Sequence, residues 1–277
     1  MASEQNKSLR NKEFFDNEAA SYDARHEKTL NQLVEEIRSR LDFIGVDWVD
    51  GSDDDSGEDE DVTKEESAPK REVRLLDYAC GTGLANTHHQ ALAPYTTQCI
   101  GIDLSGNMVA TYNTRAANQG LTPSEMHAYQ GNLLSTPPSP SLAAPAFTNF
   151  TLAAVGLGFH HFDDPALAAR RLVERLAPGG VLVVIDFLPH AKIESTHAAS
   201  HTVTRHGFEE EEVRGMFEDA GAGEGFRLEE VGIVFNRGVK EDHGHGHEHG
   251  EAGHSHGSHS GGEVRRRIFI ARGAKGV

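Results

Sequence analysis

The chain has 277 residues and a formal net charge of −17 at pH 7, and its length suits one large domain or two small ones. Such an acidic balance argues against binding to nucleic acid phosphates or to an anionic membrane surface, because both need a positive footprint. The two cysteines cannot form a disulfide framework, the N-terminal residues are polar, and no apolar run approaches the roughly 18 residues of a membrane helix. We therefore expect a cytoplasmic protein.

The first 50 residues are predicted to form cap helices. Apolar residues at positions 30, 33, 34, 37 and 41 follow the spacing of one helical face, and Phe14 and Phe15 suggest an earlier helix packed on the same core. Residues 51–71 form an acidic run with almost no apolar side chain, which cannot bury enough surface to offset its ordering entropy. We expect this run to be a disordered insertion that acts as a solvated linker, and a regulatory role stays open.

From residue 72 onward, predicted strands and helices alternate. Asp164 and Pro165 are typical of the N-cap and first turn of a helix, and Pro178 with two glycines ends that helix. Alternation at this spacing predicts a parallel sheet with helices on both faces. The predicted strands cover 73–78, 97–103, 125–130, 150–157 and 181–185, and the predicted helices cover 83–93, 106–118, 166–176 and 207–220.

The last part of the chain breaks this alternation. Residues 226–235 and 267–271 are predicted strands joined by a Gly/His tract that cannot form a packed element, so they are expected to pair as an antiparallel hairpin with a long loop. The predicted fold class is α/β: a doubly wound, mostly parallel seven-stranded sheet with a C-terminal antiparallel hairpin.

The first predicted strand leads into a glycine turn. Asp77 stands at the end of that strand, Gly81 and Gly83 follow, and Asp103 ends the next strand 20 residues after Gly83. Residues without Cβ let the backbone come close to a ligand, and a carboxylate at a strand end suits the hydroxyls of a ribose. This pattern predicts a nucleoside site.

Five motifs occur in a fixed order along the chain. They are Asp77-Tyr78-Ala79-Cys80-Gly81-Thr82-Gly83, Ile102-Asp103-Leu104-Ser105, Gly131-Asn132-Leu133, Gly158-Phe159-His160-His161-Phe162 and Leu176-Ala177-Pro178-Gly179-Gly180. Together they resemble the class I S-adenosylmethionine-dependent methyltransferases, of the small-molecule type similar to the ubiquinone/menaquinone biosynthesis methyltransferases. The resemblance extends from about Phe14 to Arg272, apart from the two predicted disordered segments, and makes residues 72–277 the S-adenosylmethionine-binding domain.

This resemblance implies S-adenosyl-L-methionine as the cofactor and a small molecule as the methyl acceptor. In the family, the glycine turn passes the methionine portion, the second strand-end acid accepts from the ribose, and apolar residues enclose the adenine. The implied cofactor-binding residues are Asp77, Ala79, Gly81, Gly83, Asp103, Leu104, Met108, Asn132, Leu133 and Tyr22. Two positions depart from the family pattern, because Asn132 replaces the usual adenine-facing acid and Thr151 stands where an acid usually begins the fourth strand.

The sulfonium methyl is already electrophilic, so a general base is needed only where the acceptor atom carries a proton. His160 is the candidate catalytic residue because its ordinary pKa range suits this task. The structural alternative is that one of the two neighbouring histidines packs under the loop and the other hydrogen-bonds the backbone. Cys80 has no cysteine partner at metal spacing, and we expect no metal at the active site.

Residues 241–262 contain seven histidines among glycines, serines and glutamates. Imidazoles at this density bind divalent metals to some degree, but their spacing specifies no fixed ligand geometry. We expect a disordered loop with adventitious divalent metal affinity.

Two other functions stay open. Asp103 lies at the offset from Gly83 that an NAD-dependent oxidoreductase would need, although Asn86 occupies the place of the third dinucleotide glycine. A non-catalytic nucleoside- or metal-binding protein on the same fold is the other alternative. In the resembling family the cap helix, the loop after the fourth strand and residues 188–206 select the acceptor, and carbon, oxygen and nitrogen acceptors all remain open.

Overall fold

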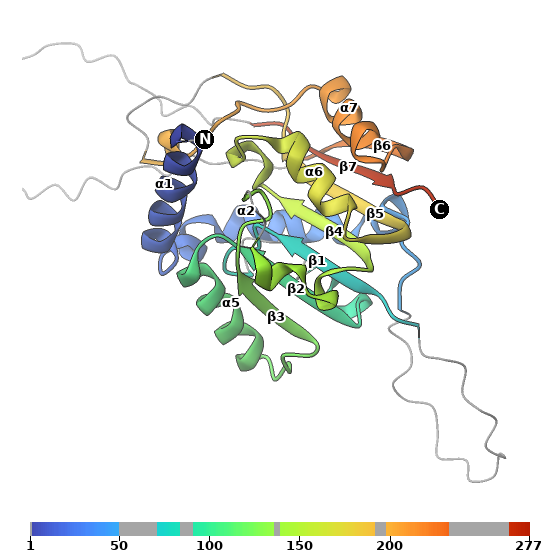
Figure 1. Ribbon diagram of the computed structural model, residues 1–277, viewed down its shortest axis with the longest axis horizontal. Helices are drawn as coiled ribbons and strands as arrows, with labels where there is room; N and C mark the ends of the chain where they lie inside the picture. Colours follow the sequence, from blue (N-terminus) through green and yellow to red (C-terminus); the bar gives the residue numbers. More distant parts are fainter. Residues whose placement is uncertain (1, 50–70, 84–90, 136–138, 192–197, 233–265) are drawn as a thin grey trace, which may run out of the picture.

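A computed structural model describes residues 2–49, 71–83, 91–135, 139–191, 198–232 and 266–277. Its centre is a seven-stranded sheet with the strand order β3-β2-β1-β4-β5-β7-β6 (Figure 1). The strands are β1 Arg74–Tyr78, β2 Gln98–Asp103, β3 Met126–Gln130, β4 Phe150–Gly156, β5 Leu176–Phe187, β6 Glu224–Val231 and β7 Ile268–Ala274.

Helices precede the sheet and connect its strands. The α-helices are α1 Ala2–Glu18, α2 Tyr22–Arg38, α3 Leu41–Ile44, α5 Gly106–Asn118, α6 Pro165–Val173 and α7 Glu210–Ala220. Short 3-10 turns are η1 Ala93–Tyr95, η2 Pro140–Ala143, η3 Pro145–Phe147, η4 Phe159–His161 and η5 Ala198–His201.

The sheet direction agrees with the sequence prediction. Strands β1 to β5 are parallel to one another, and β7 inserts antiparallel between β5 and β6. The α/β class, the doubly wound order and the antiparallel hairpin are therefore confirmed. This order places the carboxyl ends of β1, β2, β3 and β4 at one edge, and α1 lies beyond the ends of β1 and β4 (Figure 1).

The core has two main apolar layers, one on each face of the sheet. Successive residues of β5 alternate between them, because neighbouring side chains of a strand point to opposite faces. Leu182 and Val184 pack with α6, α7 and a group of buried phenylalanines, whereas Val183 and Ile185 pack with α2 and α3. Of the predicted helical face, Leu33, Val34 and Ile37 are buried in the second layer, whereas Leu41 begins the separate helix α3 and is only partly buried.

Several predicted boundaries were wrong. The helix predicted over 166–176 ends at Val173, because the chain already joins the sheet at Leu176, which pairs with Phe150. The Pro178-Gly179-Gly180 turn therefore lies inside β5 as an irregularity rather than before it, and Gly179 has φ +74°. Helix α7 begins at Glu210 rather than 207, because the backbone N–H of Phe208 donates to Phe187 O and keeps that segment beside the sheet.

Some predictions fall outside the described residues. These are most of the acidic insertion 51–71, the central part of the helix predicted over 83–93, the end of the strand predicted over 226–235, and the histidine loop 241–262.

Gly273 provides a test of the antiparallel strand. A Cβ at this position would lie 2.1 Å from Ala222 O and 2.9 Å from the Phe217 ring, so β7 and the end of α7 approach too closely for a side chain. We predict that Gly273→Ala lowers the free energy of unfolding by about 1–3 kcal/mol through overpacking. Urea denaturation measures this change.

Gly276 is the matched control, because no atom of the described residues lies within 4 Å of the place that a Cβ would take there. Gly276→Ala should change the free energy of unfolding by less than about 1 kcal/mol. Equal stability of the two variants would contradict this close approach.

Candidate active site

The turn after β1 has an unusual backbone. Ala79, Gly81 and Gly83 have φ values of +58°, +51° and +79°. Left-handed backbone in a residue with a Cβ, as at Ala79, costs on the order of 1–3 kcal/mol and is concentrated at functional sites. Gly83 has no room for a side chain, because a Cβ there would lie 2.9 Å from the Tyr112 ring. Gly83 is thus buried against Tyr112, while Ala79 and Gly81 are the partly exposed residues of the turn.

Asp103, at the end of β2, holds this turn. Its Oδ2 accepts a hydrogen bond from Gly81 N at 2.8 Å, and its Oδ1 accepts one from Ser105 N at 2.8 Å. Burial raises the pKa of Asp103 to about 6, although both backbone donors oppose this rise by stabilising the carboxylate. Asp103 thus lies beside the glycine turn, while its role toward a ribose stays a prediction. Asp77 is fully buried one residue before the end of β1.

The third motif is linked to β1 by a residue that the sequence analysis did not single out. The Tyr78 hydroxyl donates to Asn132 Oδ1 at 3.3 Å and accepts from Leu133 N at 3.3 Å, and Asn132 Oδ1 also accepts from Leu134 N at 2.8 Å. A tyrosine at the last, buried position of β1 was the available signal, because its hydroxyl needs a partner when buried.

The three residues expected to enclose an adenine differ in exposure. Met108 and Leu133 are almost fully buried, and Leu104 is partly exposed. Met108 lies in the first turn of α5, where its backbone N–H donates to the N-cap Ser105 Oγ. All three follow the carboxyl ends of β2 and β3, so the fold brings them to the same edge as Asp103.

Helix α1 is fixed to the start of α5 by Asp16. Its Oδ1 accepts from Ser105 Oγ at 2.5 Å and from Asn107 N at 3.1 Å, and its backbone oxygen accepts from Asn107 Nδ2 at 2.9 Å. Ser105 therefore contacts both the helix it caps and α1. No local pattern around Asp16 indicates this pairing.

Helix α2 is fixed to the glycine turn by Asp23. Its carboxylate accepts from Thr82 Oγ1 at 2.5 Å and from Arg115 of α5 at 2.5 Å, while Arg115 also donates to Thr82 O. The neighbouring Tyr22 is partly exposed. Burial, with the charges of Asp23 and Asp103, raises its pKa to about 12, so its hydroxyl keeps its proton and can donate. Tyr22 thus begins the helix that is held to the turn, and its contact with the donor stays a prediction.

The loop after β4 carries the two histidines. The His160 backbone N–H donates to Asp186 Oδ2 at 3.0 Å, and its ring Nδ1 lies 2.8 Å from Asp186 Oδ1. The His161 Nδ1 lies 3.0 Å from Thr202 O, and burial, followed by the nearby His160 ring, lowers the pKa of His161 to about 3. Asp186 was missed by the sequence analysis, although an acid inside the apolar end of β5 was a visible signal.

The loop after β4 is one of three segments expected to select an acceptor, and it contacts the other two, α1 and residues 188–206. From α1, Asn11 Nδ2 donates to His161 O, Phe15 packs edge-on against the His161 ring at 5.2 Å, and Phe14 packs in the same way against His201 at 5.2 Å. The Thr204 hydroxyl contacts the backbone oxygens of His160 and Phe162. The described part of 188–206, the loop and α1 therefore form one surface, and residues 192–197 lie outside the described part.

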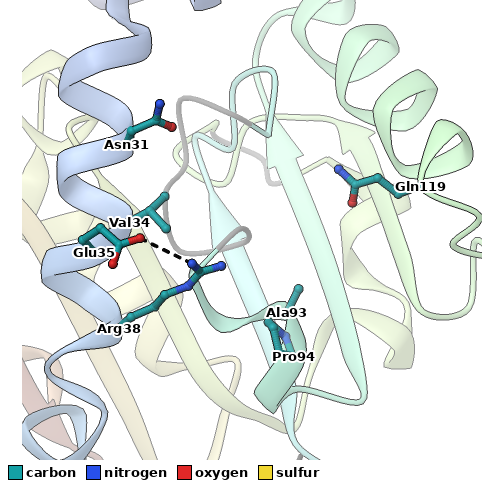
Figure 2. A pocket seen from close by; sticks show the side chains of 7 residues that line it. All are labelled: Asn31, Val34, Glu35, Arg38, Ala93, Pro94 and Gln119. Atoms are coloured by element: carbon teal, nitrogen blue, oxygen red, sulfur yellow. Dashed lines mark hydrogen bonds and ion pairs between the residues drawn. The ribbon is translucent and has the colours of Figure 1, made fainter.

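A separate hollow lies at the opposite edge of the sheet. Its volume is about 500 Å³, and Figure 2 shows α2 on one side and Ala93 and Pro94 on the other. Ala93 and Gln119 precede β2 and β3, so this hollow is at the amino ends of the strands and away from Asp103 and His160. We place the site at the carboxyl edge, because the strained turn and the converging polar groups are there. The residues lining the hollow are Asn31, Val34, Glu35, Arg38, Ala93, Pro94 and Gln119.

Within the described residues, no group of three or more His, Cys, Asp or Glu side chains could hold a metal ion. The seven-histidine loop lies outside that part of the chain. None of the described helices is long and apolar enough to cross a membrane.

Comparisons with known proteins agree with this geometry. A family described as "Methyltransferase domain" matches residues 51–223. The chain is 29% identical over 169 residues to an uncharacterised methyltransferase of Schizosaccharomyces pombe, a match that covers 58% of each chain. It is 35% identical over 127 residues to the demethylmenaquinone methyltransferase of Thermus thermophilus, covering 46% of this chain and 51% of the relative. The chain thus spans about half the length of these curated relatives.

The fold is also found among solved structures. A structure of a Thermotoga maritima protein described as an S-adenosylmethionine-dependent methyltransferase aligns with a TM-score of 0.54 at 16% identity, covering 95% of this chain and 99% of the other. At this identity the likeness shows a shared fold.

The Asp23 contacts predict how firmly α2 is held. Arg115→Ala removes the cationic donor to a partly buried carboxylate, so we expect local stability of α2 to fall by about 1–2 kcal/mol. Hydrogen exchange of peptides from residues 22–38 measures the loss. Arg38→Ala removes a mostly exposed pair with Glu35 in the same helix and should change exchange by less than about 0.5 kcal/mol. Equal effects of the two substitutions would contradict a specific role for Arg115.

Proposed function

The chain belongs to the methyltransferase-domain family, and we propose that it transfers a methyl group from S-adenosyl-L-methionine to a small-molecule acceptor. The observation that carries this proposal is the strained turn at 79–83 joined to the buried carboxylate of Asp103. The turn provides partly exposed backbone at Ala79 and Gly81, and the carboxylate provides hydrogen-bond acceptors beside it.

Asp103 retains capacity for a ribose. Its Oδ2 accepts from Gly81 N and its Oδ1 from Ser105 N, and a carboxylate offers about four lone-pair sites in all. Acceptor sites therefore remain for ribose hydroxyls. Because the backbone donors already fix the carboxylate, it needs little reorganisation when the nucleoside binds.

The other predicted contacts with S-adenosylmethionine come from residues at the same carboxyl edge of the sheet. The turn residues Ala79, Gly81 and Gly83 would face the methionine portion, with Asp77 behind them. Leu104, Met108 and Leu133 would enclose the adenine. Asn132 would accept from the adenine amino group only as an additional contact, since its Oδ1 already accepts from Tyr78 and Leu134. Tyr22 would donate from α2 above the turn.

The acceptor would bind under α1, beside His160. Bound S-adenosylmethionine supplies an electrophilic methyl group, so the protein's main task is to align donor and acceptor, worth about 7–11 kcal/mol in favourable cases. A small acceptor is supported by the similarity to a demethylmenaquinone methyltransferase and by the acidic charge of −17, which disfavours a nucleic acid. His160 is the proposed general base.

Calorimetry with S-adenosylmethionine, S-adenosylhomocysteine and NAD tests this function. Binding of the two sulfur nucleosides without NAD supports the proposal. Binding of NAD alone would instead favour the oxidoreductase alternative, and binding without turnover against a small-molecule extract would favour a non-catalytic protein.

We predict that Asp103→Ala weakens binding of S-adenosylhomocysteine by about 1.5–3 kcal/mol, or about 10- to 150-fold, because charged hydrogen bonds to the ribose are lost. Calorimetry measures the affinity. Asp42→Ala, at an exposed position of α3, is the control and should bind as the wild type does. Unchanged affinity in the Asp103 variant would refute the ribose assignment.

The pKa of Asp103 predicts a pH dependence of donor binding. Burial raises this pKa to about 6, so the carboxylate is ionised above that pH and becomes protonated as the pH falls through it. Protonation removes acceptor sites, and we expect the affinity for S-adenosylhomocysteine to fall by about tenfold from about pH 7.5 to about pH 5. In Asp103→Asn this fall in affinity with decreasing pH should be absent. A fall of the same size in that variant would show that another group causes the pH dependence.

A further inference from the structure

We propose that Asp186 is a positioning residue that keeps the ring proton of His160 on Nδ1, so that Nε2 can take a proton from the acceptor. This inference rests on the proposed function and narrows its substrate class. It requires an acceptor whose reacting oxygen, nitrogen or carbon atom carries a removable proton.

Asp186 is a fully buried carboxylate one residue before the end of β5. Its Oδ2 accepts from the His160 backbone N–H, and its Oδ1 accepts from Phe187 N at 2.7 Å and contacts His160 Nδ1 at 2.8 Å. A buried charge is costly unless it is paired and hydrogen-bonded. The backbone and ring of one residue, His160, supply two of these three partners.

The contact fixes the tautomer of His160. An ionised carboxylate can only accept, so the Nδ1 facing it must carry the proton, and in the neutral ring the lone pair is then on Nε2. The hydrogen bond from the backbone N–H of His160 to the same carboxylate limits rotation of the residue as a whole. Asp186 thus sets both the protonation pattern and the direction of the imidazole.

The adjacent histidine provides an internal contrast. The His160 and His161 ring centroids are 4.0 Å apart, but the His161 Nδ1 contacts the neutral carbonyl of Thr202 rather than a carboxylate. Burial lowers the pKa of His161 to about 3, so this ring stays neutral beside an imidazolium. Of the two histidines, His160 is the one whose ring contacts the buried carboxylate of Asp186, which would stabilise the proton it receives.

The loop that carries His160 contacts the donor turn directly. A Cβ at Gly158 would lie 3.0 Å from Ala79 Cβ, and the Phe162 ring packs 5.3 Å from the Tyr78 ring. His160 is therefore two residues from a glycine that touches the strained turn. This contact supports a base located beside the proposed methyl position.

The chemistry balances without a further reactant. A bond forms between the acceptor atom and the methyl carbon while the carbon–sulfur bond breaks and its electron pair stays on sulfur, so the sulfonium becomes a thioether. The proton of the acceptor passes to His160 Nε2. The resulting imidazolium faces the Asp186 carboxylate, which stabilises its charge.

Other ionisable groups surround this pair and bear on its pH dependence. His161 lies on the same turn, and His190 and His206 follow β5, where the His190 ring packs 5.5 Å from Phe187 and 5.7 Å from His206. Arg266, before β7, lies over the Phe187 ring at 5.4 Å. Because these groups also affect the pH dependence of methyl transfer, the test measures the tautomer of His160 in addition to the methyl-transfer rate.

The first experiment is nitrogen-15 NMR of the full chain labelled at histidine, with and without S-adenosylhomocysteine. The His160 signals are assigned by their loss in His160→Gln. We expect a protonated Nδ1 and an unprotonated Nε2 in the wild type, and a changed tautomer ratio in Asp186→Asn. A His160 ring protonated on Nε2 in the wild type would overturn the inference, whatever the activity.

The second experiment measures transfer of a tritiated methyl group to a small-molecule extract. We expect His160→Gln and Asp186→Asn each to lower the rate by about 10²–10⁴-fold, and the double variant to lose little more, since the two residues act as a unit. Affinity for S-adenosylhomocysteine should change less than about threefold. His161→Gln is the matched control and should lose less than about tenfold.

The outcomes separate the two proposals. A wild type that binds no S-adenosylhomocysteine refutes the proposed function and, with it, this inference. Normal binding together with full transfer in His160→Gln refutes the inference alone. If Asp186→Asn does not fold, the transfer rate of His160→Gln and the tautomer of His160 in the wild type still test the inference. The His160→Gln substitution leaves the Asp186 carboxylate and its hydrogen bond with the backbone N–H of residue 160 in place.

Discussion

The buried carboxylate of Asp103 joins the two parts of the chain on which the rest of the site depends, the turn after β1 and the start of α5. Removing a carboxylate from water is unfavourable, and backbone donors from Gly81 and Ser105 offset that cost. The same contacts hold Ala79 and the glycines in backbone conformations that they would otherwise leave. A strained turn, a buried carboxylate and a helix start are thus one structural unit.

The N-terminal helices are attached to this unit by two further carboxylates, Asp16 at the cap of α5 and Asp23 at the glycine turn. Both cap helices are therefore positioned by the same elements that would bind the donor. Helix α1 also packs on the loop after β4, so the same helix contacts both the start of α5 and the loop that carries the two histidines. In that loop the two neighbouring histidines differ in chemistry, because His160 faces the carboxylate of Asp186 and His161 faces a neutral carbonyl.

Short-range patterns in the sequence determined the class of fold, the order of its elements and the positions of the glycine turn and Asp103. Apolar periodicity, the Asp164 cap with Pro165 and the glycine turn all act within a few residues, so they can be recognised without the folded chain. Most strands were predicted within one or two residues, and Asp103 was expected at the end of the second. The extent of β5 was missed, because the pairing of Leu176 with Phe150 extends the strand through a turn that locally ends it.

Only the tertiary structure decided which partners complete the candidate site. Asp16 and Ser105 are 89 residues apart, Asp23 and Arg115 are 92 apart, and Asp186 and His160 are 26 apart. No local pattern identifies the partner of a carboxylate over such separations, because the pairing depends on how helices and strands pack around it. The sequence by itself therefore determined which edge of the sheet carries the glycine turn and Asp103. Packing decided which acids hold the helices over that edge and which histidine faces a buried carboxylate.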